Sequence, residues 1–357
     1  MSDVRLAGVS KRFAQTWAVR DASFHAPAGS FLSLLGPSGC GKTTTLRLIG
    51  GFETAERGDI AIGGSRINET PPWRRGLGVV FQSYALFPFM TAFENVAFGL
   101  RRRRVRGAQL SRRVHDALAL VGLPELGGRY PSELSGGQQQ RIALARALVI
   151  EPRVLLLDEP LSNLDARLRS EMRFELKRIQ RASGVTTIFV THDQEEALTL
   201  SDRIVVMNAG LVVAAGAPRE IWQRPGSRLV ADFLGVENLL PATASAPDAA
   251  RIDGSGAGLV LPADAGAGPG DRLVVGIRSH DIAIVATDEV AGPNLVPGTV
   301  GEINYRGADI VYQVATPLSD RPLVVSTELE LERGQRVTLR LPPERLMRLA
   351  PGPAAPS

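Results

Sequence analysis

The segment LLGPSGCGKTTT, residues 34–45, carries residue types that can bind a phosphate chain. It satisfies the spacing G-x-x-x-x-G-K-[ST], follows an apolar run and opens a helical pattern. Glycines let successive backbone N–H groups converge on phosphate oxygens at a helix N-terminus. The lysine reaches the β- and γ-phosphates, and the hydroxyl after it is a ligand for Mg²⁺. The alternative is a glycine-rich turn with a surface lysine. We expect a nucleotide site formed by Gly36, Pro37, Ser38, Gly39, Cys40, Gly41, Lys42, Thr43 and Thr44.

Lysine is scarce in this chain, which makes its place in the loop informative. Only Lys11, Lys42 and Lys177 occur among the 41 Lys and Arg residues. An ammonium is a compact point charge that fits inside the loop, whereas a guanidinium is larger and prefers a forked partner. We therefore expect that arginine cannot replace Lys42.

Cys40 is the only cysteine, which excludes an internal disulfide framework. It lies where helix-terminal N–H groups can lower the pKa of a thiol. The sequence therefore predicts a reactive thiol that a bound nucleotide protects.

A pair of carboxylates follows a second apolar run, VLLL at residues 154–157. The run predicts a buried strand that places Asp158 and Glu159 at its end. In that position Asp158 suits Mg²⁺, and Glu159 suits a base that polarises an attacking water. A solvated turn is the alternative, and the buried strand argues against it.

The elements that must position these groups alternate apolar strands with amphipathic helices. Residues 31–36, 153–160 and 186–193 contain continuous apolar runs, typical of parallel strands that helices cover on both faces. Between the last two runs, apolar residues recur every three or four positions and predict a helix that Gly184 ends. This expected buried stripe consists of Leu164, Leu168, Met172, Leu176 and Ile179.

Two later regions have a different pattern. Residues 84–150 contain several helical stretches and no strong strand, which predicts a helical insert. Residues 241–271 are rich in Ala, Gly and Pro, so we expect short strands at most and a flexible boundary between domains. Beyond it, short apolar runs at turn-separated intervals predict a small β-barrel or sandwich. These runs are residues 272–277, 281–286, 310–315, 322–326 and 336–341.

Composition limits the class of protein. The 357 residues are 44% hydrophobic and 22% charged, which is ordinary for globular domains, and the net charge of +4 neither demands nor excludes an anionic partner. There is no apolar run of about 18 residues and no N-terminal secretory signal. We expect a cytoplasmic protein.

The segment LSGGQQQR, residues 134–141, resembles the signature of ABC transporter ATPases and precedes VLLLDEP as that family requires. In the same family, VVFQSYALFP (79–88) resembles the Q-loop, LSNLDARLR (161–169) the D-loop and FVTHDQEEA (189–197) the switch region. The resemblance implies an α/β P-loop NTPase fold, with a parallel or mixed sheet core, a helical subdomain, and ATP and Mg²⁺ as ligands.

The resemblance also implies roles for single residues. Glu159, His192 and Gln82 are catalytic, with His192 contacting the γ-phosphate, and Gln82 joins Thr43 and Asp158 around Mg²⁺. The signature of one subunit caps the ATP held by another, so that two chains close head to tail around two ATP molecules. The residues implied at that interface are Ser135, Gly136, Gly137 and Gln138 of the signature and Asp165 of the D-loop.

The aromatic side chain that stacks on adenine is left open. The family places it after VSK at residues 9–11, where Phe13 is the best match and Trp17 a rival. Adenine stacking requires only an aromatic face, and either side chain is also suited to a core.

Closer resemblance points to the bacterial importer ATPases for maltose, polyamines, ferric iron and sulfate. These carry a C-terminal all-β, OB-like (TOBE) domain. The segments GIRSHDIAI (276–284) and LRLPPERLMRL (339–349) of this chain resemble landmarks of that domain. Relatives have Arg-Pro-Glu where this chain has Arg278, Ser279 and His280, which puts inherited regulatory contacts in doubt. The resemblance implies an ATPase domain at residues 1–235, with a helical subdomain at about 84–150, and a β regulatory or dimerisation domain at 236–357.

An importer ATPase needs partners that the chain lacks. The resemblance implies a second copy of the chain, two integral-membrane permease subunits and, indirectly, a solute-binding protein, with no nucleic-acid partner. Phe87, Phe89, Met90 and Phe93 beside the Q-loop suit either the core of the helical insert or a cradle for a partner helix. The basic run at residues 101–104 is a solvated face or a lipid site.

We therefore expect the chain at the cytoplasmic face of the inner membrane, as a peripheral subunit. Polyamines and ferric iron are the leading solutes. The alternatives are an ABC ATPase of DNA repair or translation, or a ligand-sensing role for the C-terminal domain. A long coiled-coil insertion or a second ATPase half would indicate the first alternative, and the sequence contains neither.

Overall fold

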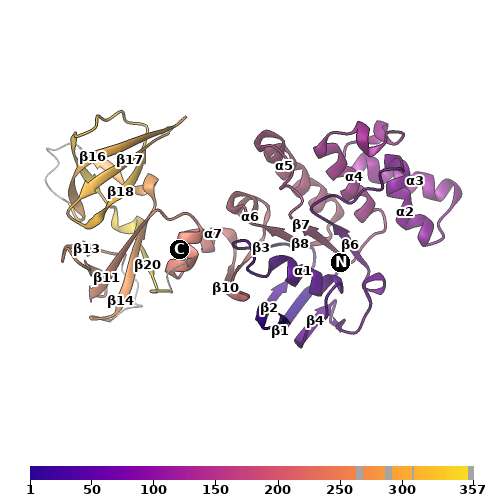
Figure 1. The fold of residues 1–357 in the computed structure, drawn as a ribbon, viewed down its shortest axis with the longest axis horizontal. Helices are drawn as coiled ribbons and strands as arrows, with labels where there is room; N and C mark the ends of the chain where they lie inside the picture. The colour runs from indigo at the N-terminus through magenta and orange to yellow at the C-terminus, as the bar shows by residue number, and fades with distance from the viewer. Residues whose placement is uncertain (263–267, 286–291, 308, 353–357) are drawn as a thin grey trace. The chain divides into compact units, whose positions relative to one another are not determined.

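The computed structural model describes residues 1–262, 268–285, 292–307 and 309–352. The chain divides into two compact units, Met1–Arg219 and Glu220–Ser357 (Figure 1). The boundary expected at residue 235 therefore falls within the second unit, after the short helices α7 (Pro218–Gln223) and α8 (Arg228–Phe233). Among the described helices, none has the length and hydropathy needed to cross a bilayer.

The first unit is built on a six-stranded sheet in the order β10-β9-β3-β8-β7-β6. The five strands β6, β7, β8, β3 and β9 are parallel to one another, and β10 runs antiparallel to β9. The three expected strands are confirmed as β3, β7 and β8. The strand bounds are β3 Phe31–Leu35, β6 Leu77–Val80, β7 Val154–Asp158, β8 Thr186–Thr191, β9 Arg203–Asn208 and β10 Leu211–Gly216.

Continuous apolar runs form these strands because both faces of the sheet are covered. In β7, Leu155 and Leu157 pack into the core that includes the long helix α5 (Ala166–Ser183). The alternating Val154 and Leu156 pack into the opposite core, with α1 (Lys42–Gly50). Because successive side chains of a strand point to opposite faces of the sheet, one run of four apolar residues contributes to two cores.

Helix α5 has the expected stripe, and its ends have clear causes. The Asp165 carboxylate caps the N-terminus by accepting from the backbone N–H of Leu168 at 2.9 Å. Gly184 ends the helix at a φ of +64°, a left-handed conformation that favours glycine. Leu164 lies just before the helix and not on it, which corrects the expected start of the stripe.

Residues 84–150 form the expected helical region, and no strand lies within this fully described range. It contains α2 (Ala92–Arg102), α3 (Gly107–Leu120) and α4 (Gly136–Leu148). Helix α2 begins with a capping box, in which Thr91 and Glu94 each accept from the other's backbone N–H. Its buried residues share one core with α3, α4 and α5.

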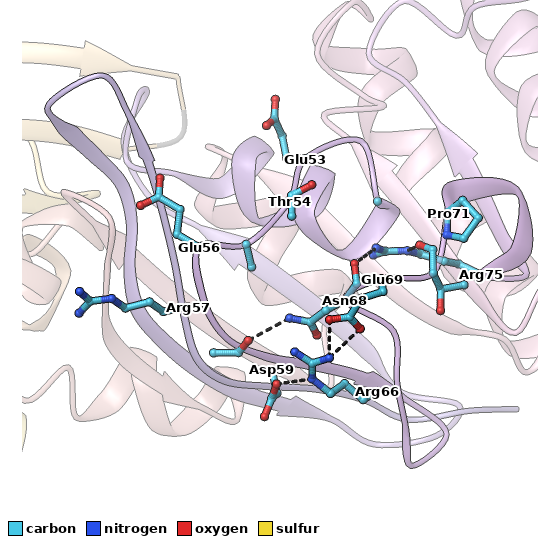
Figure 2. A pocket seen from close by; sticks show the side chains of 14 residues that line it. Glu53, Thr54, Glu56, Arg57, Asp59, Arg66, Asn68, Glu69, Pro71 and Arg75 are labelled. Carbon is cyan, nitrogen blue, oxygen red and sulfur yellow. Dashed lines mark hydrogen bonds and ion pairs between the residues drawn. The ribbon is translucent and has the colours of Figure 1, made fainter.

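A second sheet in this unit is antiparallel, in the order β2-β1-β4-β5. It carries a cavity of about 540 Å³ near β4 and β5, shown in Figure 2. Each of the four carboxylates that line this cavity, Glu53, Glu56, Asp59 and Glu69, pairs with a basic side chain. The strand bounds are β1 Val4–Phe13, β2 Thr16–Ala26, β4 Arg57–Ile62 and β5 Ser65–Arg66.

The second unit is all-β apart from short helical turns in its described part. Two five-stranded sheets share one core, in the orders β13-β12-β11-β14-β20 and β15-β19-β16-β17-β18. All five strands expected from apolar runs are found, as β14 Arg272–Ile277, β15 Ala283–Val285, β17 Asp309–Thr316, β18 Ser319–Thr327 and β19 Arg336–Arg340. Strands β16 Leu295–Arg306 and β20 Met347–Leu349 were not predicted from the apolar runs.

The expectation of a flexible boundary at residues 241–271 is wrong for most of that segment. It begins inside β11 (Asn238–Ala246), the middle strand of its sheet, and continues through β12 (Ala249–Ile252) and β13 (Gly258–Val260). Small alternating residues such as Ala242 and Ala244 are buried in the core. Alanine contributes too little apolar area to stand out as a strand by hydropathy. Residues 263–267 lie outside the described part.

Arg278 and Ser279, where the chain departs from the Arg-Pro-Glu of relatives, are both buried. The Arg278 guanidinium lies 3.3 Å above the ring of Trp222 and donates to the carbonyl of Leu234 at 2.9 Å. The backbone N–H of Ser279, which a proline would lack, donates to Glu237 at 3.1 Å. The departure is therefore accommodated within the fold.

Candidate functional site

The loop between β3 and α1 has the backbone shape that a phosphate chain requires. A Cβ at Gly36 would lie 2.2 Å from the carbonyl oxygen of Met207, and one at Gly41 would lie 2.2 Å from that of Ala18. Gly41 also has a φ of +106°. Both positions therefore require glycine, because the loop passes close to two neighbouring strands. Between them lie Pro37, Ser38 and Gly39, and Thr44 follows in α1.

Lys42 is 4% exposed and lies inside this loop. Its Nζ donates to the carbonyl oxygens of Gly36 at 2.7 Å and Pro37 at 2.9 Å. Those carbonyls hold the ammonium at the first turn of α1, where the helix N-terminus favours an anion. The arrangement fits a triphosphate chain, because the backbone N–H groups and the positive charge of Lys42 converge there.

The structure contradicts the expected lowering of the Cys40 pKa, and the reactivity of the thiol stays a prediction. The side chain is 3% exposed and packs in the core beneath the loop. Burial raises the pKa of the Cys40 thiol, and the nearby Lys42 ammonium offsets this only in part. A helix N-terminus lowers a thiol pKa only where the thiolate keeps solvent or hydrogen bonds.

Thr43 and Asp158 come together although they are far apart in the sequence. The Thr43 hydroxyl donates to Oδ1 of Asp158 at 3.0 Å, which joins the start of α1 to the end of β7. Burial raises the pKa of the Asp158 carboxyl above its ordinary value, and the hydrogen bond from Thr43 offsets this only in part. A hydroxyl and a carboxylate oxygen are the ligand types that Mg²⁺ takes beside nucleotide phosphates, so these two residues fit that ion.

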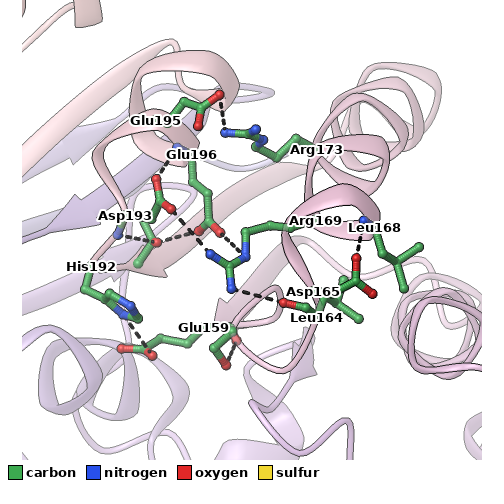
Figure 3. A network of polar contacts seen from close by, with 12 residues as sticks. Glu159, Leu164, Asp165, Leu168, Arg169, Arg173, His192, Asp193, Glu195 and Glu196 are labelled. Carbon is green, nitrogen blue, oxygen red and sulfur yellow. Dashed lines mark hydrogen bonds and ion pairs between the residues drawn. The ribbon is translucent and has the colours of Figure 1, made fainter. Parts of the chain in front are cut away.

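Glu159 and His192 lie at the ends of the neighbouring strands β7 and β8. Nδ1 of His192 is 3.2 Å from Oε2 of Glu159, as Figure 3 shows. Glu159 has a φ of +42°, unusual for a residue with a side chain, and its N–H donates to the carbonyl of Val190 at 3.1 Å. Strain of this kind concentrates at functional sites, where it fixes the direction of a side chain.

Gln82 lies just beyond β6 and contacts the D-loop segment. Its side-chain amide donates to the hydroxyl of Ser162 at 3.2 Å, and its carbonyl accepts from Asn163 at 2.8 Å. After it, Tyr84 and Ala85 both have left-handed backbone conformations. The structure therefore ties Gln82 to residues 162–163, and its place beside Mg²⁺ stays a prediction.

The signature residues begin helix α4, which packs against α2, α3 and β6. Helix α1, which follows the phosphate-binding loop, packs instead against β7 and β8. Ser135 caps α4 and accepts from the N–H of Gln138 at 3.3 Å, within a capping box. A Cβ at Gly137 would lie 3.0 Å from the side chain of Leu168 on α5, and one at Gly136 would lie 3.3 Å from Leu164. The signature therefore touches the D-loop segment of its own chain.

Both candidate adenine aromatics lie on the β1–β2 hairpin. Phe13 is 47% exposed, and Trp17 is half-buried beneath the guanidinium of Arg12. Trp17 precedes Ala18, whose carbonyl borders Gly41. The hairpin therefore brings an aromatic face to the loop, and the choice of Phe13 stays a prediction.

Sequence reasoning missed four side chains that hold the site. The Arg146 guanidinium, on α4, donates to the carbonyls of Tyr84 at 2.8 Å and Ala85 at 2.7 Å, and so fixes the strained turn after Gln82. Arg169, Thr191 and Glu196 form a network around His192. Thr191 and Glu196 lie within the switch motif, but no feature of the sequence distinguished Arg146 and Arg169 from the other arginines of the chain.

A phosphate-binding loop on a parallel sheet, with a threonine–aspartate pair and an adjacent glutamate, defines a P-loop ATPase. Two family matches then narrow the class: residues 19–162 match the ABC transporter family and residues 275–349 match the TOBE domain. The chain belongs to the ATP-binding proteins of ABC transporters, in the importer group, and it is an ATPase coupled to transport. The expected fold class is confirmed, and the DNA-repair and translation alternatives are set aside.

Curated relatives resemble the chain over most of its length. It is 49% identical over 319 residues to the spermidine/putrescine import ATP-binding protein PotA of Rubrobacter xylanophilus, covering 88% of this chain and 84% of the relative. The protein of the same name from Methylococcus capsulatus is 45% identical and covers 94% of this chain and 89% of the relative.

Solved structures match about three fifths of the chain. The ATP-binding cassette MJ0796, in a dimeric post-hydrolysis state with ADP and Pi, is 33% identical with a TM-score of 0.53. That match covers 60% of this chain and 99% of the cassette. A second dimeric structure of the same cassette matches with a TM-score of 0.54.

Proposed function

We propose that this chain is the ATP-hydrolysing subunit of a bacterial polyamine importer. The observation that carries the solute is the similarity, at 49% and 45% identity over most of both chains, to proteins named for spermidine and putrescine import. Nothing in the ATPase need touch the solute, so the site itself supports only the energy-coupling part of this proposal.

The residues of the site take the following roles. Loop N–H groups and the Lys42 ammonium bind the β- and γ-phosphates, and Thr43, Asp158 and Gln82 hold Mg²⁺, which supplies charge neutralisation when bound. Glu159 accepts a proton from the attacking water. His192, 3.2 Å from Glu159, contacts the γ-phosphate from the adjacent strand end.

Two copies close head to tail around two ATP molecules. The dimeric cassette structures support this arrangement. The position of the signature residues also supports it. Ser135, Gly136, Gly137 and Gln138 form the start of α4, where Ser135 is exposed and helix N–H groups can face the γ-phosphate of a partner. Asp165 then lies at the same interface, since Gly136 and Gly137 border Leu164 and Leu168 on either side of it.

Two permease subunits dock beside the Q-loop. Of the four apolar residues expected there, Phe87 packs at a tilt against Phe98 and Phe93 packs at a tilt against His115, whereas Phe89 is 92% exposed. Phe52 and Phe81, whose rings contact each other at a tilt, are also exposed. Large exposed aromatics next to Gln82 suit a partner helix. The assembly places the chain at the cytoplasmic face of the inner membrane, with the solute-binding protein reached only through the permease.

The solute is tested by uptake in cells. A strain that lacks this gene should lose uptake of radiolabelled spermidine and putrescine and keep uptake of ferric iron. Uptake should return with the wild-type gene but not with Glu159→Gln. Loss of iron uptake with normal polyamine uptake would overturn the choice of solute and leave the ATPase role intact.

A further inference from the structure

Two short segments are joined by a polar network at the start of α5 and α6 (Gln194–Leu200), as Figure 3 shows. One is the D-loop segment, residues 161–169. The other is the switch turn, residues 191–196, which carries His192. The proposed function gives both segments a role in hydrolysis, and the network offers a physical link between them.

Within the switch turn, the Thr191 hydroxyl holds the backbone next to His192. It accepts from the N–H of Asp193 at 3.0 Å and donates to Oε2 of Glu196 at 2.5 Å. Asp193 in turn caps α6 by accepting from the N–H of Glu196 at 3.0 Å. Thr191 and Glu196 are 2% and 4% exposed, so these bonds are sheltered from water and define one geometry of the turn.

Arg169 connects this turn to the D-loop segment. Its Nη2 donates to the carbonyl of Leu164 at 3.0 Å, next to Asp165. Its Nη1 lies 3.7 Å from Oδ2 of Asp193, and its Nε lies 3.9 Å from Oε1 of Glu196. The guanidinium therefore makes one hydrogen bond to the D-loop side and two ion pairs to the switch side, as Figure 3 shows. The buried Nε has no hydrogen-bond partner, so its contact with Glu196 is electrostatic.

We propose that Arg169 is a positioning residue that couples the D-loop to His192. Because a planar guanidinium fixes the directions of its nitrogens, a shift of the Leu164–Asp165 backbone changes the place of Asp193 and Glu196. Asp193 and Glu196 in turn fix the backbone of the switch turn through their hydrogen bonds. The link lets the D-loop, once it meets a partner subunit, align His192 and Glu159 for hydrolysis.

The chain offers a matched control one helical turn further along α5. Arg173 pairs with Glu195 through one nitrogen, Nη1, at 2.8 Å. A lysine ammonium can reproduce a single contact but not three divergent ones. Arg169→Lys and Arg173→Lys are therefore the same chemical change on the same helix, and only the first removes the link.

The test is steady-state ATP hydrolysis by the purified full-length chain with Mg²⁺. We expect Arg169→Lys to lower kcat about ten- to a hundredfold, with KM for ATP within about twofold of wild type, because alignment changes and nucleotide binding does not. Arg173→Lys should stay within about twofold in both constants. In a double-mutant cycle, Asp165→Asn should cost less in the Arg169→Lys background than in wild type.

Other outcomes separate the ideas. Equal kcat in the two arginine variants, a loss confined to KM, or additive effects with Asp165→Asn would overturn the coupling. Absence of hydrolysis by the wild-type chain would contradict the proposed function itself. Should Arg169→Lys fail to fold, Thr191→Val tests the same link from the switch side, with Thr191→Ser expected to restore the wild-type kcat.

Discussion

Nδ1 of His192 lies 3.2 Å from Oε2 of Glu159, so that side chains from two neighbouring strand ends meet at one point. Parallel strands end at the same edge of the sheet, which is why residues 33 positions apart converge. The pair fixes the direction of Glu159, whose role as the acceptor of a proton from water is the first to test.

Replacement of Glu159 by glutamine should separate binding from hydrolysis. The amide keeps the shape but cannot accept a proton, so we expect Glu159→Gln to bind ATP normally and to lose at least about a hundredfold in turnover. The variant should accumulate as an ATP-bound dimer. ATPase assays and gel filtration in ATP measure both effects, and near-normal turnover would remove Glu159 from the role of base.

Lys42→Arg keeps the charge and should still fail. The ammonium lies between the carbonyls of Gly36 and Pro37 at 2.7 and 2.9 Å, where a forked guanidinium has no room. We expect at least about a tenfold loss in nucleotide affinity or turnover, measured by fluorescent-nucleotide titration and ATPase assay. Lys177→Arg is the matched control, because Lys177 lies on α5, pairs with Asp202 at 3.0 Å and has no assigned role in nucleotide binding, so it should behave as wild type.

Cys40 should react slowly with thiol reagents at neutral pH. Burial raises the pKa of the thiol, so the reactive thiolate is depleted below that pKa and its fraction grows as the pH rises toward it. Alkylation followed by mass spectrometry should show that the reaction rate begins to rise only at a higher pH than for an exposed cysteine. Cys40→Ser should keep ATPase activity. Rapid alkylation at neutral pH with loss of activity would contradict the buried position.

Motif spacing and hydrophobic runs predicted the phosphate-binding loop and the three strands β3, β7 and β8, because each of these strands ends at a motif. Val154 to Leu157 place Asp158 and Glu159 without any knowledge of the rest of the chain. The pairing of Thr43 with Asp158 follows once β3 and β7 share a sheet.

Other features depend on contacts that are distant in sequence. Arg146 and Arg169 act through guanidinium geometry toward backbone carbonyls, and arginine at a helical position is compatible with many surroundings. Cys40 was misjudged because burial opposes the effect of the helix N-terminus. Strand β11 was missed because its buried positions include Ala242 and Ala244, which a hydropathy pattern scarcely distinguishes from a linker.

The first unit should carry the ATP chemistry alone. A chain that ends after Arg219 keeps both sheets of that unit, all of α1 to α6 and every residue assigned to the nucleotide site. We expect it to fold, to bind ATP with an affinity within about threefold of the full chain, and to dimerise in ATP when it carries Glu159→Gln.

A chain that ends after Leu240 is the control. It cuts β11 within its sheet and leaves the buried residues Val230, Ala231 and Leu240 without their core, so it should be less soluble than the shorter chain. Titration with a fluorescent nucleotide and gel filtration measure the outcomes. A folded Arg219 truncation that does not bind ATP would mean that the second unit contributes to the nucleotide site.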